Sequence, residues 1–96
     1  MDRTSILNKV SKLKPEIRRK FKADILGVFG SYARDEANMD SDLDVLVRFH
    51  EDATLLELTG LGDFLESKLD CKVDVLSQRV IRAETEPYIM EDLIPV

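Results

Sequence analysis

The sequence contains little cysteine, no long apolar run and no excess of positive charge. Cys71 is the only cysteine among 96 residues, so no internal disulfide can form and nothing points to an oxidising compartment. No apolar run approaches the ~20 residues of a membrane-spanning helix. Charges at Asp2 and Arg3 also interrupt the N-terminus, where a signal peptide would be apolar. These absences predict a cytoplasmic protein with no membrane association.

Positive charge is scarce, because 14 lysines and arginines face 19 aspartates and glutamates, for a formal net charge of −5. Proteins that bind long nucleic acids usually carry a broad basic surface. The charge therefore weighs against an enzyme that copies a nucleic-acid template, although one local basic patch would suffice for a nucleotide. The chain has no internal repeat, low-complexity tract or linker, which predicts one domain over residues 1–96.

The most informative segment runs from Gly30 to Asp44, between two apolar runs. The first run, Ile25–Phe29, stops at a Gly-Ser pair, and the second, Asp42–Phe49, begins with two carboxylates already embedded in it. Apolar runs rich in β-branched and aromatic residues and bounded by glycine are typical of strands. The segment is therefore expected to connect the end of one strand to the start of the next.

The second strand places two carboxylates together. Side chains alternate between the faces of a strand, so Asp42 and Asp44 share one face, about 7 Å apart, while Leu43 and Val45 point the other way. Two ionised carboxylates at that distance raise each other's pKa unless a cation lies between them. Mg²⁺ binds in proteins through one or two carboxylates together with substrate phosphates. The pattern therefore indicates a metal site, although an Asp-x-Asp pair alone is also common on exposed strands.

Gly30 and Ser31 supply the complementary half of the site. Glycine allows a phosphate to approach the backbone, and a hydroxyl with amide groups at a helix start favours an anion. Together with the two carboxylates, the pair predicts a site for phosphates and a metal.

These residues resemble the signature of the DNA polymerase β-type nucleotidyltransferase superfamily, in which Gly-Ser precedes Asp-x-Asp. Here ten residues separate Ser31 from Asp42. The flanking segments 29–34 and 40–47 are most similar to the minimal nucleotidyltransferases (MNT) of HEPN–MNT toxin–antitoxin pairs. One position departs from the family pattern, because Asp35 stands where the family often has glycine.

The resemblance implies a fold and a set of functional residues. It implies an α/β (α+β) polymerase β-like fold, with helices on one face of a small mixed sheet made of Ile25–Phe29, Asp42–Phe49 and Lys72–Leu76. Within the apolar segment Lys72–Leu76, Asp74 is costly to bury unless it is paired or binds a metal, and the alternative is an acid at a strand edge that faces water. Asp74 also matches the position of the family's third carboxylate. The resemblance assigns catalysis and two Mg²⁺ ions to Asp42, Asp44 and Asp74. Asp74 is also a candidate acceptor of the hydroxyl proton, although a metal-bound carboxylate is a poor base. Nucleotide binding falls to Gly30 and Ser31, with Arg34 as a supporting residue.

The resemblance also implies an activity and a partner. Such a protein would transfer AMP from ATP to a hydroxyl, expected to be a tyrosine, of a cognate HEPN-domain toxin and would thereby act as an antitoxin. The alternative is a binding module that neutralises its toxin by contact alone. No residue pattern in the sequence reads the base, so the choice of ATP follows from the resemblance only.

Several other elements are predicted from local patterns. Apolar residues at helical spacing predict helices from Thr4 to Leu13 and from Pro15 to Lys22, divided because proline disfavours helical geometry in the residue before it. Ser31 to Ala37 should form a short helix. Thr54 and Glu57 form a capping-box pattern that predicts the start of a longer helix, and Thr85 is a candidate cap for a last one.

Some charged and aromatic side chains have two interpretations. Tyr32 is expected to be a core aromatic, with a lid over the nucleotide as the alternative. Arg34 can pair either with a phosphate or with Glu36 or Asp40. His50 is assigned no role. The basic residues of the first two predicted helices form a solvated face or, in the alternative, meet an acidic partner: Lys12, Lys14, Arg18 and Arg19.

Overall fold

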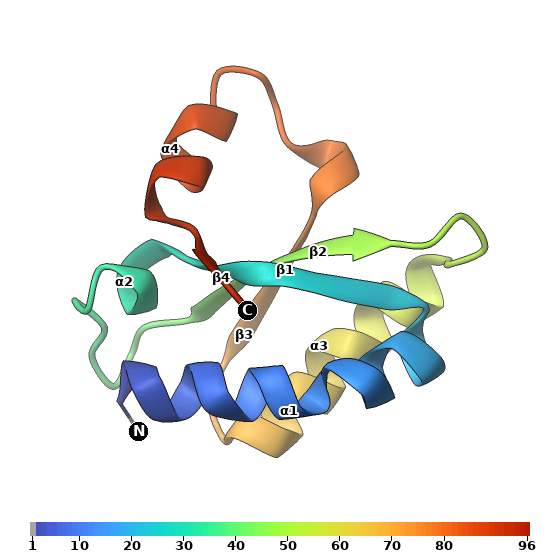
Figure 1. The fold of residues 1–96 in the computed structure, drawn as a ribbon, viewed down its shortest axis with the longest axis horizontal. Helices are drawn as coiled ribbons and strands as arrows, with labels where there is room; N and C mark the ends of the chain where they lie inside the picture. Colours follow the sequence, from blue (N-terminus) through green and yellow to red (C-terminus); the bar gives the residue numbers. More distant parts are fainter. Residues whose placement is uncertain (1) are drawn as a thin grey trace.

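A computed structural model describes residues 2–96 and contains one four-stranded sheet. The elements follow the chain in this order: α1 (Arg3–Phe21), β1 (Ala23–Phe29), α2 (Gly30–Ala33), β2 (Leu43–Phe49), α3 (Leu55–Leu69), β3 (Val73–Ser77), the 3₁₀ helix η1 (Gln78–Val80), α4 (Glu86–Asp92) and β4 (Ile94–Pro95) (Figure 1). Within residues 2–96, no helix combines the length and apolarity needed to cross a membrane.

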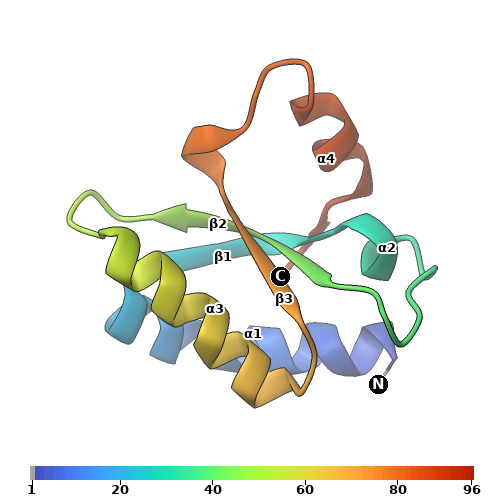
Figure 2. The same cartoon turned by 180° about the vertical axis from the view of Figure 1, so that it is seen from behind.

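The sheet is mixed, in the order β3-β2-β1-β4. β1 is antiparallel to β2 and to β4, whereas β2 and β3 are parallel and are joined by α3. Helices α1 and α3 cover one face, and α4 stands on the opposite side of the sheet (Figures 1 and 2). The predicted α/β fold with a small mixed sheet is confirmed, but the expectation that the helices lie on one face holds for α1 and α3 and not for α4. The sequence did not predict β4, because a two-residue strand that includes a proline gives no strand pattern.

Alternation along the strands places the core between the sheet and helices α1 and α3. Every second residue of β2 is buried, at positions 43, 45, 47 and 49, and these side chains join one apolar cluster with residues of the two helices. The helices contribute the following fully buried side chains: Ile6, Val10, Ile17, Leu61, Leu65 and Leu69. The intervening residues of β2 therefore belong to the opposite face of the sheet.

Helix α1 is continuous through Pro15, so the predicted division into two helices is wrong. Proline removes one helical hydrogen bond and crowds the preceding turn, at a cost of about 3 kcal/mol. Ile6 and Val10 before the proline and Ile17 after it are all essentially inaccessible and pack into the same cluster. Burying three large aliphatic side chains is worth about 1.5–3 kcal/mol each, which outweighs the cost of the proline.

Helix α3 starts as its sequence predicts. The Thr54 hydroxyl accepts a hydrogen bond from the Leu56 amide, and the Glu57 carboxylate accepts one from the Thr54 amide at 3.0 Å. Hydrogen bonds from the hydroxyl and the amide of Thr54 lower the pKa of Glu57 to about 2. The capping box therefore fixes the point where the chain turns from β2 into α3.

Candidate functional site

Both halves of the predicted site meet at one end of the sheet. β1 ends at Phe29, which lies opposite Asp44 of β2, and Gly30 begins α2 directly afterwards. β3 pairs with β2 in parallel register, so that Asp74 lies beside Asp44 on the neighbouring strand. Asp42 comes immediately before β2, which begins one residue later than predicted. This carboxylate end of the sheet thus combines the Gly-Ser turn with three aspartates.

Gly30 fits its position for two reasons. Its φ of +74° lies in the left-handed region that glycine enters without strain. In addition, a Cβ atom at this position would collide with Oδ2 of Asp44. The Gly-Ser turn therefore packs its backbone directly against the central carboxylate, which joins the two halves of the site.

Asp44 lies on the face of the sheet away from α1 and α3, because its neighbours Leu43 and Val45 are both buried in the core. Asp44 is half-buried, whereas Asp42 and Asp74 are exposed. The predicted placement of the carboxylates on the face opposite these two helices is therefore correct for Asp44, and the register gives Asp74 the same placement.

Electrostatics at this end of the sheet are unfavourable for a negative charge. Burial raises the pKa of Asp44 above its ordinary value, the charges of Asp74 and then Asp42 raise it further, and Arg34 only partly offsets them. Burial and the neighbouring carboxylates thus both disfavour the ionised form of Asp44. A bound cation would favour that form.

The three aspartates do not converge into a closed cage. Among residues 2–96, no group of three histidine, cysteine, aspartate or glutamate side chains approaches closely enough to hold a metal ion by itself. Mg²⁺ does not require such a cage, because it keeps several waters and is completed by substrate phosphates. Hard carboxylate oxygens and a raised pKa at Asp44 fit a magnesium ion that binds together with a nucleotide.

Arg34 follows α2 and is held by two carboxylates. Its Nη1 lies 2.6 Å from Asp92 of α4, and its Nε lies 3.2 Å from Glu36. Of the two salt bridges that the sequence allowed as alternatives to a phosphate, the one to Glu36 is observed and the one to Asp40 is not, and Asp92 was not anticipated. These two carboxylates raise the pKa of Arg34, with Asp92 the larger cause. The ion pair thereby ties the Gly-Ser turn to α4.

Asp35 adopts the left-handed backbone conformation, with φ of 61°. Helix α2 ends at Ala33, so the predicted helix to Ala37 is too long. The family often has glycine at this position, and the φ value supplies the physical reason. Aspartate tolerates this region better than most residues because its short polar side chain bonds locally, so the departure from the family pattern leaves the turn intact.

Tyr32 is a partly buried residue packed against the main apolar cluster, which confirms its interpretation as a core aromatic. Burial raises the pKa of its hydroxyl, and the nearby Cys71 and Asp42 add to the effect. Burial also raises the pKa of the Cys71 thiol, which keeps that thiol protonated and poorly nucleophilic. Both side chains pack against the main apolar cluster.

Comparisons with known proteins agree with this geometry. The family model described as the nucleotidyltransferase domain matches residues 10–94. The protein adenylyltransferase MntA of Thermococcus cleftensis is 36% identical over 83 residues, which cover 86% of this chain and 84% of that protein. A presumed protein adenylyltransferase of Methanocaldococcus jannaschii is 38% identical over 87 residues, 86% of each chain.

Solved structures share the fold. A presumed minimal nucleotidyltransferase superposes with a TM-score of 0.84 at 35% identity and covers 100% of this chain and 97% of its own. An MNT antitoxin in complex with the tri-AMPylated HEPN toxin of Shewanella oneidensis gives a TM-score of 0.70 at 22% identity, with 97% of this chain and 70% of that one covered. The second likeness shows the fold alone.

Proposed function

The chain belongs to the nucleotidyltransferase domain family, and we propose that it is a Mg²⁺-dependent enzyme that transfers AMP from ATP to a tyrosine hydroxyl of a HEPN-domain toxin. In this role the protein is the antitoxin of the pair. The observation that carries the proposal is the meeting of Gly30 and Ser31 with Asp42, Asp44 and Asp74 at one end of the sheet.

Asp42 and Asp44 hold the two Mg²⁺ ions, and Asp74 assists at one of them. The raised pKa of Asp44 supports this assignment, because a cation would relieve the repulsion that Asp74 and Asp42 exert on it. Without a cation, the three aspartates would also repel the phosphates of ATP. When bound, the metal ions lower the pKa of the acceptor hydroxyl and neutralise charge on the triphosphate. The metal ions would thus allow two anionic groups that repel each other, the aspartates and the nucleotide, to share one site.

Gly30 and Ser31 hold the β- and γ-phosphates through backbone amides and the hydroxyl. Arg34 approaches the same phosphates with its planar guanidinium, which matches phosphate oxygens in a bidentate manner. Because Arg34 is paired with Asp92 at 2.6 Å, the phosphates compete with that carboxylate for the guanidinium.

The reaction is an in-line displacement at the α-phosphorus. The acceptor oxygen forms a bond to the α-phosphorus, and the bond from this phosphorus to the α–β bridging oxygen breaks, so that pyrophosphate leaves with the electron pair. Asp74, exposed at the edge strand β3, is the candidate residue to receive the hydroxyl proton. Holding the α-phosphorus and the hydroxyl in line supplies much of the rate enhancement.

Exposed apolar side chains favour a protein as the acceptor. The chain exposes apolar side chains that a protein partner can cover, among them Val80 of η1 and Tyr88 and Met90 of α4, each at least half exposed. Names of relatives point in the same direction, since they describe protein adenylyltransferases, and solved relatives of the same fold are MNT–HEPN complexes, one with an AMPylated toxin. These exposed apolar residues of η1 and α4 therefore support delivery of the acceptor by a partner protein.

Mass spectrometry of a mixed reaction tests the proposal. The protein is incubated with a cognate HEPN-domain toxin, ATP and Mg²⁺, and the toxin should gain roughly 329 Da for each AMP transferred. The Asp42→Asn/Asp44→Asn variant should transfer none and should fail to protect cells. If that variant protects cells as well as the parent protein does, neutralisation is by binding alone and the enzymatic role is refuted.

A further inference from the structure

The ion pair of Arg34 with Asp92 joins two segments that flank the proposed phosphate site. Arg34 follows directly after α2, and Asp92 is the last residue of α4. Helix α4 stands on the face of the sheet that α1 and α3 leave open, which is also the face of Asp44 (Figures 1 and 2). The ion pair therefore connects the Gly-Ser turn to a helix on the same side as the carboxylates.

Two of the three nitrogens of the Arg34 guanidinium already donate to carboxylates. Nη1 donates to Asp92 at 2.6 Å and Nε donates to Glu36 at 3.2 Å, so that within residues 2–96 only Nη2 lacks a hydrogen-bond partner. A bidentate contact with a phosphate uses two neighbouring nitrogens. A phosphate bound in this way would therefore share a nitrogen with one of the two carboxylates, and the two anions would repel each other.

Asp92 is the carboxylate whose displacement has a structural consequence. Glu36 lies two residues after Arg34 with a side chain that is 65% exposed, so it can turn into water. The Asp92 side chain is only 25% exposed and is fixed to α4. A triphosphate that takes over Arg34 would leave Asp92 beside a like charge instead of a cation. Loss of the pair would therefore remove an attraction that holds the end of α4 against the turn.

The remaining attachment of α4 is light. Among residues 86–92 only Ile89 is buried, and within residues 2–96 no backbone amide donates a capping hydrogen bond to the Thr85 side chain. After the helix, Leu93 packs closely against Gly27, and β4 adds two residue pairs with β1. An element with so little buried apolar surface opens at a low cost in free energy. One ion pair is therefore a substantial part of what holds α4.

We propose that Asp92 controls the affinity for ATP and couples it to α4: Asp92 withholds Arg34 until the phosphates displace it, and this displacement loosens α4. The inference rests on the proposed binding of ATP at the Gly-Ser turn. Tyr88 and Met90 of α4, each at least half exposed, are side chains that a partner protein can cover. Because coupling between two ligands is reciprocal, a partner that draws Asp92 away from Arg34 raises the affinity for ATP by the same factor.

Calorimetric titration of the full chain with ATP and Mg²⁺ tests the control of affinity. Asp92→Asn keeps the size of the side chain and removes its charge. The variant should bind ATP about fivefold more tightly, which is the upper range for an exposed ion pair. A purely structural role for Asp92 predicts unchanged or weaker binding, so the direction of the change distinguishes the two.

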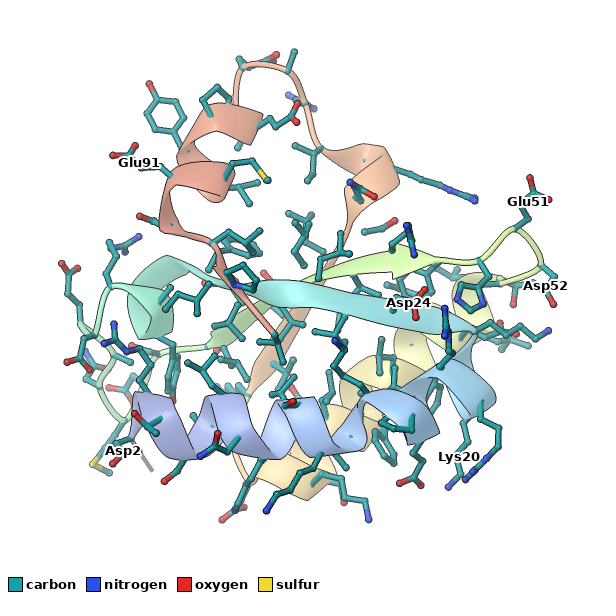
Figure 3. All side chains as sticks on the ribbon, in the orientation of Figure 1. Asp2, Lys20, Asp24, Glu51, Asp52 and Glu91 are labelled. Atoms are coloured by element: carbon teal, nitrogen blue, oxygen red, sulfur yellow. The ribbon has the colours of Figure 1, made fainter. Side chains whose placement is uncertain are left out.

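Glu91→Gln is the matched control. Glu91 is exposed on the outer side of α4 (Figure 3), and Arg34 pairs with Glu36 and Asp92 rather than with Glu91. The substitution removes the same charge one residue away and should tighten ATP binding by less than about twofold. In an Arg34→Gln background, Asp92→Asn should have no larger effect than Glu91→Gln, because the guanidinium that it releases is absent.

Hydrogen exchange followed by NMR tests the coupling to α4 without any substitution. Mg²⁺ with a non-hydrolysable ATP analogue should make the amides of residues 89–92 exchange about fivefold faster, since it removes the ion pair. The amide of Leu65, buried in α3, should not change. In Asp92→Asn the amides of α4 should exchange faster even without nucleotide, and the analogue should have little further effect.

Three results would overturn the proposal: unchanged or weaker binding of ATP by Asp92→Asn, an equal gain in affinity in Glu91→Gln, and unchanged or slower exchange in α4 when the analogue binds. In each of these cases the parent protein still binds ATP, and the proposed function survives. A parent protein that binds no ATP with Mg²⁺ would refute the proposed function and this inference together.

Discussion

Two aspartates at opposite ends of the same pair of strands have opposite electrostatic surroundings. Asp44 of β2 is half-buried among the like charges of Asp74 and Asp42, and its pKa is raised. Asp24 of β1 loses some stabilisation through burial, but hydrogen bonds from His50 and Arg48 and the attraction of Arg18 outweigh that effect and lower its pKa. The same residue type is thus stabilised as an anion at one end of the sheet and destabilised at the other.

The difference separates a structural carboxylate from a functional one. Asp24 has its partners within the chain: Arg18, Arg48 and, at 3.0 Å, Nε2 of His50. Around Asp44, by contrast, Arg34 only partly offsets the like charges of Asp74 and Asp42, and Oδ2 lies where a Cβ on Gly30 would collide with it. A carboxylate whose charge is left uncompensated is a candidate to bind a ligand that compensates it. We therefore expect substitution by asparagine to have opposite effects on thermal stability at the two aspartates, and very different effects on activity.

Activity should show the largest difference. The Asp42→Asn/Asp44→Asn variant should lose AMP transfer by at least about a thousandfold, because metal ions contribute several kcal/mol to the transition state. Asp24→Asn should keep activity within a few fold. Rates are measured from single-turnover reactions with labelled ATP, and circular dichroism establishes that each variant is folded. A large loss in Asp24→Asn with the fold intact would break the distinction between the two ends.

Within the carboxylate end, the phosphate side and the acceptor side should separate. Ser31→Ala should weaken ATP affinity by about tenfold, since it deletes one donor to a charged acceptor worth roughly 1–3 kcal/mol. Asp74→Asn should lower turnover more than it lowers affinity. Calorimetric titration of ATP and steady-state rates give the two quantities. Equal losses of affinity, with turnover unchanged in both variants, would contradict the division.

Asp24→Asn and Asp44→Asn should change the melting temperature at pH 7 in opposite directions. Asp24 has a lowered pKa, so its contribution is present above the ordinary carboxylate range and is lost as the pH falls through its folded value. Asp24→Asn should therefore lower the melting temperature at pH 7. The loss should be about 4–8 °C, if it amounts to about 1 kcal/mol after allowance for the exposed arginines. The difference should shrink as the pH is lowered below the ordinary carboxylate range.

Asp44 should show the reverse. Its pKa is raised, so the folded state is favoured while the group is protonated and loses stability as the pH rises through the folded value. Without divalent cations, Asp44→Asn should raise the melting temperature at pH 7 by a few degrees and should change it little at pH 3. Thermal melts across this pH range measure both variants. Destabilisation by Asp44→Asn at pH 7 would mean that the carboxylate is structural.

The smallest effect is expected at Asp35, which lies in the turn between the two halves of the site. Its φ of 61° costs an L-residue roughly 1–2 kcal/mol, and less for aspartate. Asp35→Gly should therefore stabilise the fold by up to about 1 kcal/mol, while Asp35→Val, with its branched side chain, should destabilise it. Urea unfolding measures both. The same sign for both substitutions would show that backbone conformation does not control this position.

Local sequence patterns predicted β1, β2 and β3 and the meeting of the Gly-Ser turn with Asp42 and Asp44, because alternation and spacing determine which side chains share a face. The family resemblance added Asp74, and β4 was not predicted. Asp92 was missed as the partner of Arg34, since 58 residues separate the two and nothing local links them. His50 was assigned no role, yet it pairs with Asp24 across 26 residues. Helix α1 runs through Pro15 because tertiary packing outweighs the local penalty. Local sequence patterns therefore could not predict the contacts between segments that lie far apart in the chain.

Three statements remain predictions: the cytoplasmic location, the single domain over residues 1–96, and the residues that bind the metal ions and the nucleotide. Among the ligands, the carboxylates carry the central claim, because the proposed metal site depends on the like charges around Asp44, which Arg34 only partly offsets.

The pKa of the Asp44 carboxyl, measured by NMR titration of the side-chain carbon, tests that claim most directly. In the absence of divalent cations the account predicts a value above the ordinary aspartate range, while Asp24 titrates below it. Saturating Mg²⁺ with a non-hydrolysable ATP analogue should lower the Asp44 value by more than one pH unit, since a cation within about 4–6 Å lowers a carboxyl pKa by 1–3 units, and should leave Asp24 unchanged. An ordinary or lowered value for Asp44 without metal, or no response to Mg²⁺ and nucleotide, would contradict the account.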